Sequence, residues 1–486
     1  MSSLTMPTPA VSDPDDVPGP RRNPELRLLF GAFGVVAFAY VNVAGSLKGQ
    51  HASAILGYMI AFMVVTLGAH LAIRHWAPYA DPLLLPVATL LNGLGIVFIY
   101  RLSLVGKFGN PGNPGTKSGL SVPVPLSSTL NQIIYTLIGI ACFVAVLKFI
   151  AEPRVLQRYT YILGLTGLIL IALPAFLPSS ISGVAGTGAK IQISIGGFSL
   201  QPGEFGRLAL AAFFAGYLVA KRDVLALAGK RVLGIDLPRG RDLGPIVAIW
   251  ALSMLLLVFE ADVGMSAVFM GLFVSMLYIA TSRTSWLLLG FSMFILGALI
   301  AWQLIPHVGQ RFEIWLHAFN SSVVNAQVGS SYQLVQGLYG LGNGGLLGKG
   351  LGGGEPYWTP LVQSDLIFTG FGEEIGLAGL MAMLVLYALI VQRGLRTALM
   401  VKDPFSKLLA GGLSFMFAMQ VFVIVGGVTR LIPLTGITTP FLSLGGSSLI
   451  ANWAVIGLLA RLSDTARRPA PKPIQDEGLT QVVSLK

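Results

Sequence analysis

The 486-residue chain is poor in charge and in cysteine. Charged residues make up 11% of it, whereas 54% of its residues are hydrophobic and its mean hydropathy is +0.75. No soluble core of this length needs so much apolar surface, so the composition indicates an integral membrane protein. The one cysteine, Cys142, lies in an apolar run. It excludes a disulfide framework and a thiolate metal site, and it says nothing about the cell compartment.

Several sequence motifs of soluble enzymes are also missing. The five histidines are scattered and form no H-x-x-x-H pair, and no G-x-S-x-G occurs, so neither a zinc site nor a serine hydrolase of that type has support. GLGNGG formally satisfies the dinucleotide-binding pattern, but no predicted strand precedes it. GNGGLLGKG fails as a P-loop because Asn343 and Gly350 stand where glycine and a hydroxyl residue are required.

Long apolar segments take the place of these motifs. A helix needs about 17–25 apolar residues to cross a bilayer core. Twelve segments of roughly this kind predict an all-α, polytopic bundle of membrane helices: 26–47, 53–73, 82–100, 128–148, 159–178, 205–220, 244–259, 264–281, 286–305, 366–392, 405–428 and 445–461.

The net charge of +11 is distributed unevenly between the two sides of this bundle. With the N-terminus inside, only nine of the 32 basic residues fall on the outer side. Basic residues concentrate on the cytoplasmic side of membrane proteins, so the pattern predicts that both termini are cytoplasmic. The basic excess then orients helices and meets anionic lipid, and we expect no nucleic-acid partner.

The chain divides into polar ends and an apolar body. Residues 1–24 are polar and proline-rich and are typical of a disordered cytoplasmic tail, as is the segment 463–486. The longest outer segment, 306–365, is the place where we expect chemistry, because loops of this length in compact proteins are uncommon unless they are functional.

A glycine-rich stretch, GLYGLGNGGLLGKGLGGGEP, occupies residues 337–356 of that outer segment. Two interpretations are open. The stretch forms a tight re-entrant turn, or its backbone approaches a ligand phosphate closely with the help of Lys349.

Ionisable residues at membrane depth are costly and are therefore candidates for function. Glu204 and Arg207 are spaced i, i+3 at the start of one span, as a structural ion pair would be. Glu260 and Asp262 break a long apolar stretch at an outer turn, where they serve chain reversal or hold a metal or a hydroxyl group.

The densest group of acids lies at the outer mouth of the 366–392 span. Asp365 stands at this mouth, and Glu373 and Glu374 lie about 12 Å further in, at 1.5 Å per helical residue. Such depth favours a cavity-lining role. Arg430, on the outer side, supplies a cation that can face an anionic head group.

Six ordered motifs carry a resemblance to a known family. In chain order they are QPGEFGRLAL, FEADVGMSAV, QRFEIWLHAF, SYQLVQGLYGLGNGGLLGKGLG, QSDLIFTGFGEEIGLAG and PLTGITTPFLSLGGSSLIANW. Together they resemble the SEDS family of RodA and FtsW, over roughly residues 82–461. The resemblance implies a polytopic glycosyltransferase that polymerises lipid II into peptidoglycan strands outside the cytoplasmic membrane. It also implies a class B penicillin-binding protein as partner.

The resemblance assigns roles where residues match. The family's catalytic aspartate corresponds to Asp365, but the histidine of that motif is replaced by Gln363. Asp262 keeps the acid of a second motif, and Ser443 matches a serine of a third.

A fourth motif of the family is matched in part. Glu204 and Arg207 match its acid and the cation that follows. Upstream, the family's arginine is absent, and Lys190 stands nearby.

The resemblance also divides the chain. Residues 25–81 form two extra N-terminal helices, and 82–462 form the ten-helix core of the family. The extension and the short C-terminal tail are more similar to the elongation branch than to the division branch.

The implied chemistry requires a base and cations. A sugar hydroxyl attacks an anomeric carbon while a polyprenyl pyrophosphate leaves, so we expect Asp365 to accept the proton. We expect Arg311, Lys349 and Arg430 to stabilise the pyrophosphate. No cofactor is certain, and a divalent cation such as Mg²⁺ or Mn²⁺ is left open. Two rival interpretations are a transporter of a lipid-linked precursor and a non-catalytic scaffold.

Overall fold

The computed structural model describes most of the chain between Arg22 and Pro469. The described residues are 22–46, 52–105, 124–178, 181–182, 192–195, 198–226, 228–232, 235–238, 251, 263–326 and 330–469.

Helices dominate these described residues, as the apolar segments predict. The long helices are α1 (Asn23–Ser46), α2 (Ala52–Trp76), α3 (Leu84–Val105), α4 (Leu126–Phe149), α6 (Thr160–Phe176), α7 (Gly203–Ala226), α9 (Val263–Thr281), α10 (Ser285–Leu304), α14 (Ile367–Met400), α15 (Pro404–Val428) and α16 (Gly446–Arg467). The short elements are α5 (Val155–Arg158), α11 (Pro306–Leu316), α12 (Ser321–Val324), α13 (Tyr332–Gly344), the 3₁₀ turn η1 (Pro356–Trp358) and the strands β1 (Ile193–Ile195), β2 (Phe198–Leu200), β3 (Ala228–Val232) and β4 (Ile235–Pro238).

The prediction of a polytopic helix bundle is confirmed. Within the described residues, ten helices are long and apolar enough to cross a membrane, and α6 is a shorter apolar helix of 17 residues. Eleven of the twelve predicted segments therefore correspond to a helix. The twelfth, 244–259, lies outside the described residues except for Ala251. In the part of the chain that the structure describes, the strands form two small antiparallel hairpins, β1–β2 and β3–β4.

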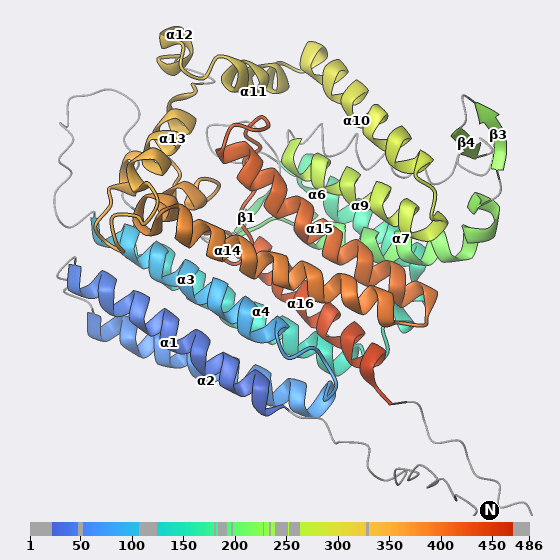
Figure 1. Cartoon of the computed structure of the whole chain (residues 1–486), viewed down its shortest axis with the longest axis horizontal. Coiled ribbons are helices and arrows are strands. Elements are labelled where there is room, and N and C mark those ends of the chain that lie inside the picture. Colours follow the sequence, from blue (N-terminus) through green and yellow to red (C-terminus); the bar gives the residue numbers. More distant parts are fainter. Residues whose placement is uncertain are drawn as a thin grey trace, which may run out of the picture.

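The bundle has two distinct ends, which we name from the segments that they carry. The tail end holds Arg22 and the last turn of α16. The loop end holds α11–α13, and Asp365 lies on it just before α14 begins. The helices run between these ends in Figure 1, where α14, α15 and α16 occupy the middle of the bundle.

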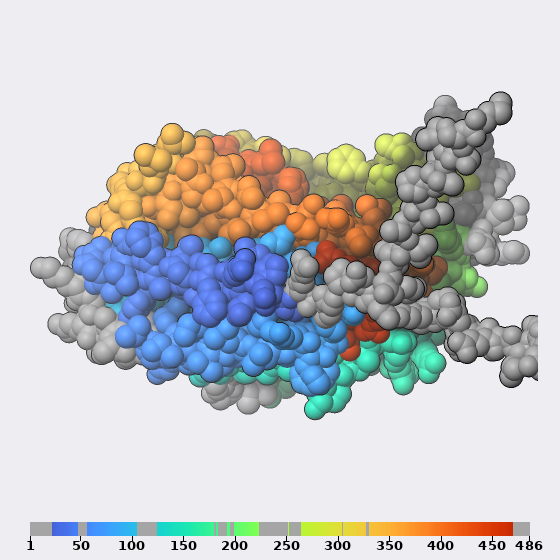
Figure 2. All heavy atoms as spheres, turned by 60° about the horizontal axis from the view of Figure 1, so that its bottom comes forward, coloured from blue at the N-terminus to red at the C-terminus, as the bar shows by residue number. Residues whose placement is uncertain are grey.

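The two N-terminal helices cover one face of the bundle. Helix α1 packs on α3 and α2 packs on α4, and Figure 2 shows α1 and α2 side by side on that face. At the tail end, the buried Glu25 accepts a hydrogen bond of 2.5 Å from Arg22 and lies 2.8 Å from Nδ1 of His70. The Tyr79 N–H donates to Asp464 at 2.8 Å. The contacts of Glu25 join α1 to α2, and the bond from Tyr79 holds the predicted extension against α16.

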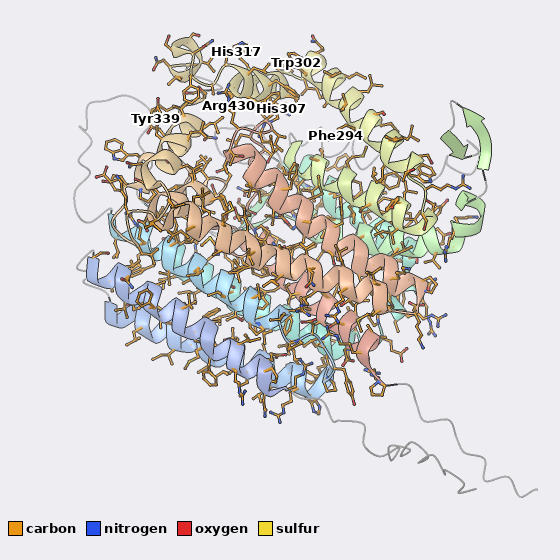
Figure 3. The ribbon with its side chains drawn as sticks, in the orientation of Figure 1. Phe294, Trp302, His307, His317, Tyr339 and Arg430 are labelled. Carbon is orange, nitrogen blue, oxygen red and sulfur yellow. The ribbon has the colours of Figure 1, made fainter. Side chains whose placement is uncertain are left out.

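Helix α10 stands apart from the other long helices. Only 17% of its apolar window is buried, compared with 94% for α16. Figure 1 shows α10 along the upper edge of the bundle, where it leads into α11, and Figure 3 shows Phe294 on it. Because its apolar side chains are exposed all round, α10 presents them to lipid.

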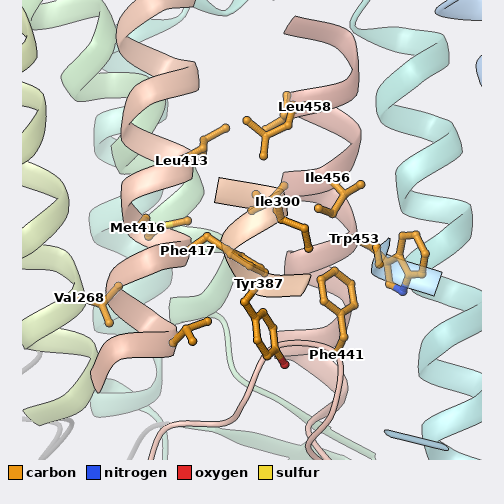
Figure 4. Close-up of a cluster of buried hydrophobic side chains, with 14 of the residues drawn as sticks. Val268, Tyr387, Ile390, Leu413, Met416, Phe417, Phe441, Trp453, Ile456 and Leu458 are labelled. Atoms are coloured by element: carbon orange, nitrogen blue, oxygen red, sulfur yellow. The ribbon is translucent and has the colours of Figure 1, made fainter. Parts of the chain in front are cut away.

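An irregular segment, 433–445, returns into the bundle after α15. Helix side chains satisfy its backbone: Tyr387 donates a hydrogen bond of 2.6 Å to the Pro440 carbonyl, and Gln420 donates one of 3.0 Å to the Thr438 carbonyl. Its aromatic residue Phe441 packs between Phe417 and Trp453 (Figure 4). A non-helical backbone at membrane depth is stable only where protein groups pair its N–H and C=O groups, so this segment is a built feature of the core.

Candidate active site

Asp365 lies in a series of tight turns that ends where α14 begins. The residue is 8% exposed, and the Ser364 hydroxyl donates a hydrogen bond of 3.0 Å to its Oδ1. Just upstream, Leu361 adopts a left-handed backbone conformation with φ = 58°. This irregular backbone presents the carboxylate at the loop end before the helix continues into the bundle.

Ser443 joins the Asp365 turn to the returning segment 433–445. Its hydroxyl donates to the Ser364 carbonyl and accepts a 2.8 Å hydrogen bond from the Thr439 N–H. The Leu444 N–H donates to the Gln363 carbonyl at 2.8 Å. Ser443 is 3% exposed. These contacts therefore hold the backbone just before Asp365, and the substrate-binding role expected for Ser443 stays a prediction.

Gly436 brings Asp365 and Arg311 to the same point. A Cβ on Gly436 would lie 3.7 Å from Arg311 Nη2 and 4.0 Å from Asp365 Oδ2. The Arg311 guanidinium also donates a 2.6 Å hydrogen bond to the Leu434 carbonyl. With φ = 77°, Gly436 occupies a backbone region that favours glycine. The missing side chain leaves a carboxylate and a guanidinium facing one small space.

Burial raises the pKa of the Asp365 carboxyl above its ordinary value. The Ser364 hydrogen bond and the charge of Arg311 act in the opposite direction and lower this pKa, but burial is the largest cause. A buried carboxylate is a stronger proton acceptor than one in water, because its charged form has lost hydration.

Glu374 pairs with an arginine from another helix. Arg101 Nε on α3 donates a 2.5 Å hydrogen bond to Glu374 Oε1, and the Gly352 N–H donates to Oε2 at 3.1 Å. A second Arg101 nitrogen donates to the Gly354 carbonyl. Both charged side chains are at most 1% exposed. Glu374 is therefore paired with a buried cation.

Glu373 lines a cavity of about 390 Å³ and also holds the glycine-rich segment. Its Oε1 accepts hydrogen bonds from Asn343 Nδ2 at 2.9 Å and from the Glu355 N–H at 3.1 Å. The depth of Glu373 favours a cavity-lining position, which it has, and its role in binding substrate stays a prediction.

The glycine-rich stretch packs its backbone against a break in α14. Gly376 has φ = 67° within that helix, and the N–H groups of Leu377 and Ala378 donate to the carbonyls of Gly345 and Leu346, each at 3.0 Å. A Cβ on Gly348 would lie 2.3 Å from the Glu374 carbonyl oxygen. Glycine is required here for close backbone approach.

Lys349, in the same stretch, has an exposed side chain. Its N–H donates to the Glu373 carbonyl at 3.1 Å. This geometry favours the tight-turn interpretation of the stretch. A role of Lys349 toward a phosphate stays a prediction.

Arg430 binds the end of α11. Its Nε donates to the Trp315 carbonyl at 2.8 Å and its Nη2 to the Leu316 carbonyl at 2.9 Å, and its guanidinium lies 5.4 Å from the Phe319 ring centre. Arginine near a helix C-terminus satisfies carbonyls that have no partner in the helix. Figure 3 shows Arg430 close to α11, near His307. These contacts anchor the helix that carries Arg311.

The predicted pair Glu204 and Arg207 forms an ion pair at the start of α7, with both side chains buried. Nearby, the Gln201 N–H donates a 2.7 Å hydrogen bond to the Ser447 hydroxyl. The structural pair is thus observed.

Asp262 and Lys190 lie outside the described residues. Gly264 follows Asp262 closely in sequence, and the side chains nearest to it are those of Thr435 and Ile437.

The described residues contain no group of three or more His, Cys, Asp or Glu side chains that could hold a metal ion. They therefore form no closed cage of protein ligands. Mg²⁺ is commonly bound by one or two carboxylates together with water and substrate phosphate. Asp365 is the described carboxylate at the site that is suited to such open binding.

Sequence reasoning missed three groups that shape the site. Arg101, Gln420 and Tyr387 lie in apolar helices and look like ordinary span residues in the sequence. The signal for Arg101 was present, because a cation beside an apolar span needs a buried acid as partner. Tyr387 and Gln420 gave no local signal, since their partners are backbone carbonyls of a distant segment.

A multispanning helix bundle that buries a carboxylate beside an arginine at one end defines an integral membrane protein with a polar site facing that end. The chain belongs to the FtsW, RodA and SpoVE family, described as cell cycle proteins, whose family profile it matches over residues 81–468.

Curated relatives cover nearly the whole chain. It is 46% identical over 451 residues to the peptidoglycan glycosyltransferase RodA of Mycobacterium tuberculosis, with 92% of each chain covered. It is 44% identical over 449 residues to that of Mycobacterium leprae, again with 92% of each covered. It is 30% identical over 335 residues to the probable peptidoglycan glycosyltransferase FtsW of Geobacter metallireducens, which covers 68% of this chain and 84% of the relative.

Solved structures share the fold at lower identity. A chain from a peptidoglycan synthase complex, solved for the structural coordination of polymerization and crosslinking, matches with a TM-score of 0.61 and 22% identity, covering 80% of this chain and 99% of the other. The rod shape determining protein RodA of Thermus thermophilus matches with a TM-score of 0.53 and 21% identity, covering 80% of this chain and 98% of the other.

Proposed function

We propose that the chain is a RodA-type peptidoglycan glycosyltransferase that polymerises lipid II, with Asp365 as its general base. The observation that carries the proposal is the buried Asp365 carboxylate beside Arg311, in a chain that is 46% identical over 92% of its length to a peptidoglycan glycosyltransferase RodA. The longer and closer match to RodA than to FtsW supports the elongation branch of the family.

The reaction joins two lipid-linked sugars. A hydroxyl oxygen of one sugar forms a bond to the anomeric carbon of the other, the bond between that carbon and the pyrophosphate oxygen breaks, and the hydroxyl proton passes to Asp365. General-base catalysis of this kind contributes about 10²–10⁴-fold to a rate. Burial prepares Asp365 for this step because it raises the pKa of the carboxyl.

Arg311 is the cation best placed to act with this base. Its guanidinium reaches the same small space as Asp365 beside Gly436, and its 2.6 Å bond to the Leu434 carbonyl fixes its direction. A preorganised cation stabilises the negative charge that develops on the leaving pyrophosphate. In this proposal Arg430 acts indirectly, by anchoring the end of α11.

A divalent cation, Mg²⁺ or Mn²⁺, is a separate part of the proposal. When bound, such an ion would neutralise pyrophosphate charge. Asp365, and Asp262 outside the described residues, are the acids available to hold it. Chelation with EDTA tests this part, since loss of polymer that Mg²⁺ or Mn²⁺ restores would support it and unchanged polymer would contradict it.

The proposal also includes the orientation of the chain in the membrane and a partner protein. The loop end faces outward and the tail end, with both termini, faces the cytoplasm, which agrees with the bias of basic residues toward that side. A class B penicillin-binding protein would crosslink the strands. The fold match to a chain of a peptidoglycan synthase complex supports such an assembly.

The test is polymerisation of purified lipid II in detergent by the wild-type chain, with its crosslinking partner present, and by Asp365→Asn. We expect polymer from the first and at least a hundredfold less from a folded second, in line with the loss of a general base. Equal polymer from both would remove the catalytic role of Asp365. No polymer from either would favour the transporter or the scaffold.

A further inference from the structure

The cavity of about 390 Å³ that Glu373 lines opens between α13 and the η1 turn. It lies apart from the contacts that bring Asp365 and Arg311 together at Gly436. Its walls are formed by ten residues: Gln336, Leu338, Tyr339, Gly340, Gly342, Asn343, Glu355, Trp358, Thr359 and Glu373. Two of these carry a negative charge, and none of the described residues that line the cavity is basic.

The floor of the cavity is a buried carboxylate held in one orientation. Glu373 is 3% exposed, and the hydrogen bonds from Asn343 and from the Glu355 N–H both end on its Oε1. Its Oε2 lies on the side of Gly340, where an added Cβ would be 3.5 Å away. The missing side chain of Gly340 therefore leaves room in front of this oxygen.

The rim combines a second carboxylate with aromatic rings. The Trp358 indole N–H donates a 3.0 Å hydrogen bond to Glu355 Oε2, which fixes the ring and the acid relative to each other. Tyr339 is 60% exposed, and Figure 3 shows it projecting from α13. Aromatic faces and carboxylates both attract organic cations, the faces through the ring quadrupole and the acids through charge.

We propose that this cavity binds a primary ammonium group on a short carbon chain, held between Glu373 and Glu355 with Trp358 and Tyr339 beside its methylene groups. An anionic ligand would meet two carboxylates and no basic side chain among the residues that line the cavity. An uncharged ligand would bring no positive charge to these acids. A flexible aminoalkyl group meets both demands, since its head is a charge and its stem is apolar.

The ammonium belongs to the peptide of the lipid-linked substrate, an assignment that rests on the proposed function. Glu373 lines the cavity and follows Asp365 by eight residues, and the chain is helical from Ile367 onward, so the two Cα atoms lie at most about 16 Å apart. A peptide of five residues spans up to about 17 Å. An amine-bearing side chain within such a peptide can therefore reach this cavity while its sugar lies at Asp365.

The experiment compares two forms of lipid II in the polymerisation assay with the complete complex. One form has a free side-chain amine in its peptide, and in the other that amine is acetylated. For the wild-type chain we expect acetylation to raise KM about fivefold to tenfold while kcat changes less than twofold, because the cavity is remote from the reacting atoms.

Two variants locate the effect. Glu355→Gln removes the exposed rim carboxylate, and Gly340→Ala places a methyl group in ordinary contact with Glu373 Oε2 without a clash. In both, the free-amine substrate should approach the KM of the acetylated one, and acetylation should add little. Glu313→Gln, which neutralises an exposed acid on α11 that pairs with His317 at 3.1 Å, is the matched control and should keep the wild-type response.

The outcomes separate the two proposals. Equal KM values for the two substrates in an active wild-type enzyme would overturn the ammonium site and leave the glycosyltransferase intact. A full acetylation effect that persists in both Glu355→Gln and Gly340→Ala would also overturn it, because the amine would then be bound elsewhere. If the wild-type complex makes polymer from neither substrate, the proposed function is overturned and the inference with it.

Discussion

Arg101 Nε donates a 2.5 Å hydrogen bond to Glu374 Oε1, although the two residues are 273 positions apart in sequence. This bond joins α3, the first helix of the core predicted from the family resemblance, to the part of α14 that lies just before its break at Gly376. The same arginine binds the Gly354 carbonyl, so one side chain holds a span, a broken helix and the glycine-rich segment together.

Removal of either partner of this pair should be strongly destabilising. Breaking a buried ion pair leaves an uncompensated charge and costs about 3–5 kcal/mol. We therefore expect Glu374→Gln and Arg101→Met each to lower the thermal unfolding midpoint in detergent. The double variant should recover part of the loss, because both charges are then absent. A double variant as unstable as the sum of the two singles would contradict this coupling.

Gly348 should tolerate alanine much less well than Gly350. Both have positive φ, 79° and 88°, so alanine at either position has a similar backbone cost of about 1–2 kcal/mol. At Gly348, however, the new Cβ meets the Glu374 carbonyl at 2.3 Å, while at Gly350 nothing lies within 4 Å. We expect Gly348→Ala to lose clearly more stability than Gly350→Ala, as measured by thermal unfolding. Equal losses would show that the close packing is unimportant.

The membrane helices were predictable from sequence because a span is a local property. An unbroken apolar segment of bilayer length must form a helix, whatever its neighbours are. For the same reason the acids Asp365, Glu373 and Glu374 were recognisable as candidates, since a charge beside or within such a segment is costly wherever it lies.

The connections of the site were not predictable from local sequence. Gly436 and Asp365 are far apart in the chain, and only the return of 433–445 into the bundle brings them together. The outer segment also holds more structure than its glycine content suggests, with α11, α13 and η1 packed against the bundle. Glycine signals both flexible turns and close backbone contacts, and sequence alone cannot separate the two.

Activity should rise with pH through the raised pKa of Asp365, because the ionised carboxylate is the proton acceptor. Below that pKa the carboxyl is protonated and cannot act as base. The positive charge of Arg311 lowers this pKa, so Arg311→Gln should raise it further and shift the acidic limb of kcat/KM to higher pH. Among neighbouring groups, the pKa of His307 is lowered, by burial first and by Arg311 second.

His307 therefore provides a control for this profile. Its pKa should rise when Arg311 is removed, so His307→Gln in the Arg311→Gln background tests whether the shifted limb belongs to the histidine. We expect the limb to remain where Arg311→Gln places it. A limb that disappears with His307 would assign the titration to the imidazole.

The raised pKa of Asp365 makes folding stability depend on pH in the opposite direction to activity. A carboxyl whose pKa is raised in the folded state binds its proton more tightly there than in the unfolded chain. Its contribution therefore favours folding at low pH and becomes unfavourable as pH rises above the unfolded pKa. Asp365→Asn removes this cost, so the variant should be at least as stable as the wild type at neutral pH, which thermal unfolding in detergent checks.

Gly436→Ala should reduce activity more than it reduces stability. With φ = 77°, the residue carries the usual strain of alanine in the left-handed region, and its methyl group would lie 3.7 Å from Arg311 and 4.0 Å from Asp365. These are ordinary contacts, so the fold can accept them, but they fill the space that the carboxylate and the guanidinium face.

Gly350→Ala has comparable strain and open surroundings, and it is the matched control. Because misplacement by about 1 Å can cost a hundredfold in rate, we expect kcat/KM to fall about tenfold to a hundredfold in Gly436→Ala and little in Gly350→Ala. A similar loss in both would mean that backbone strain, and not the shared space between Arg311 and Asp365, sets the activity.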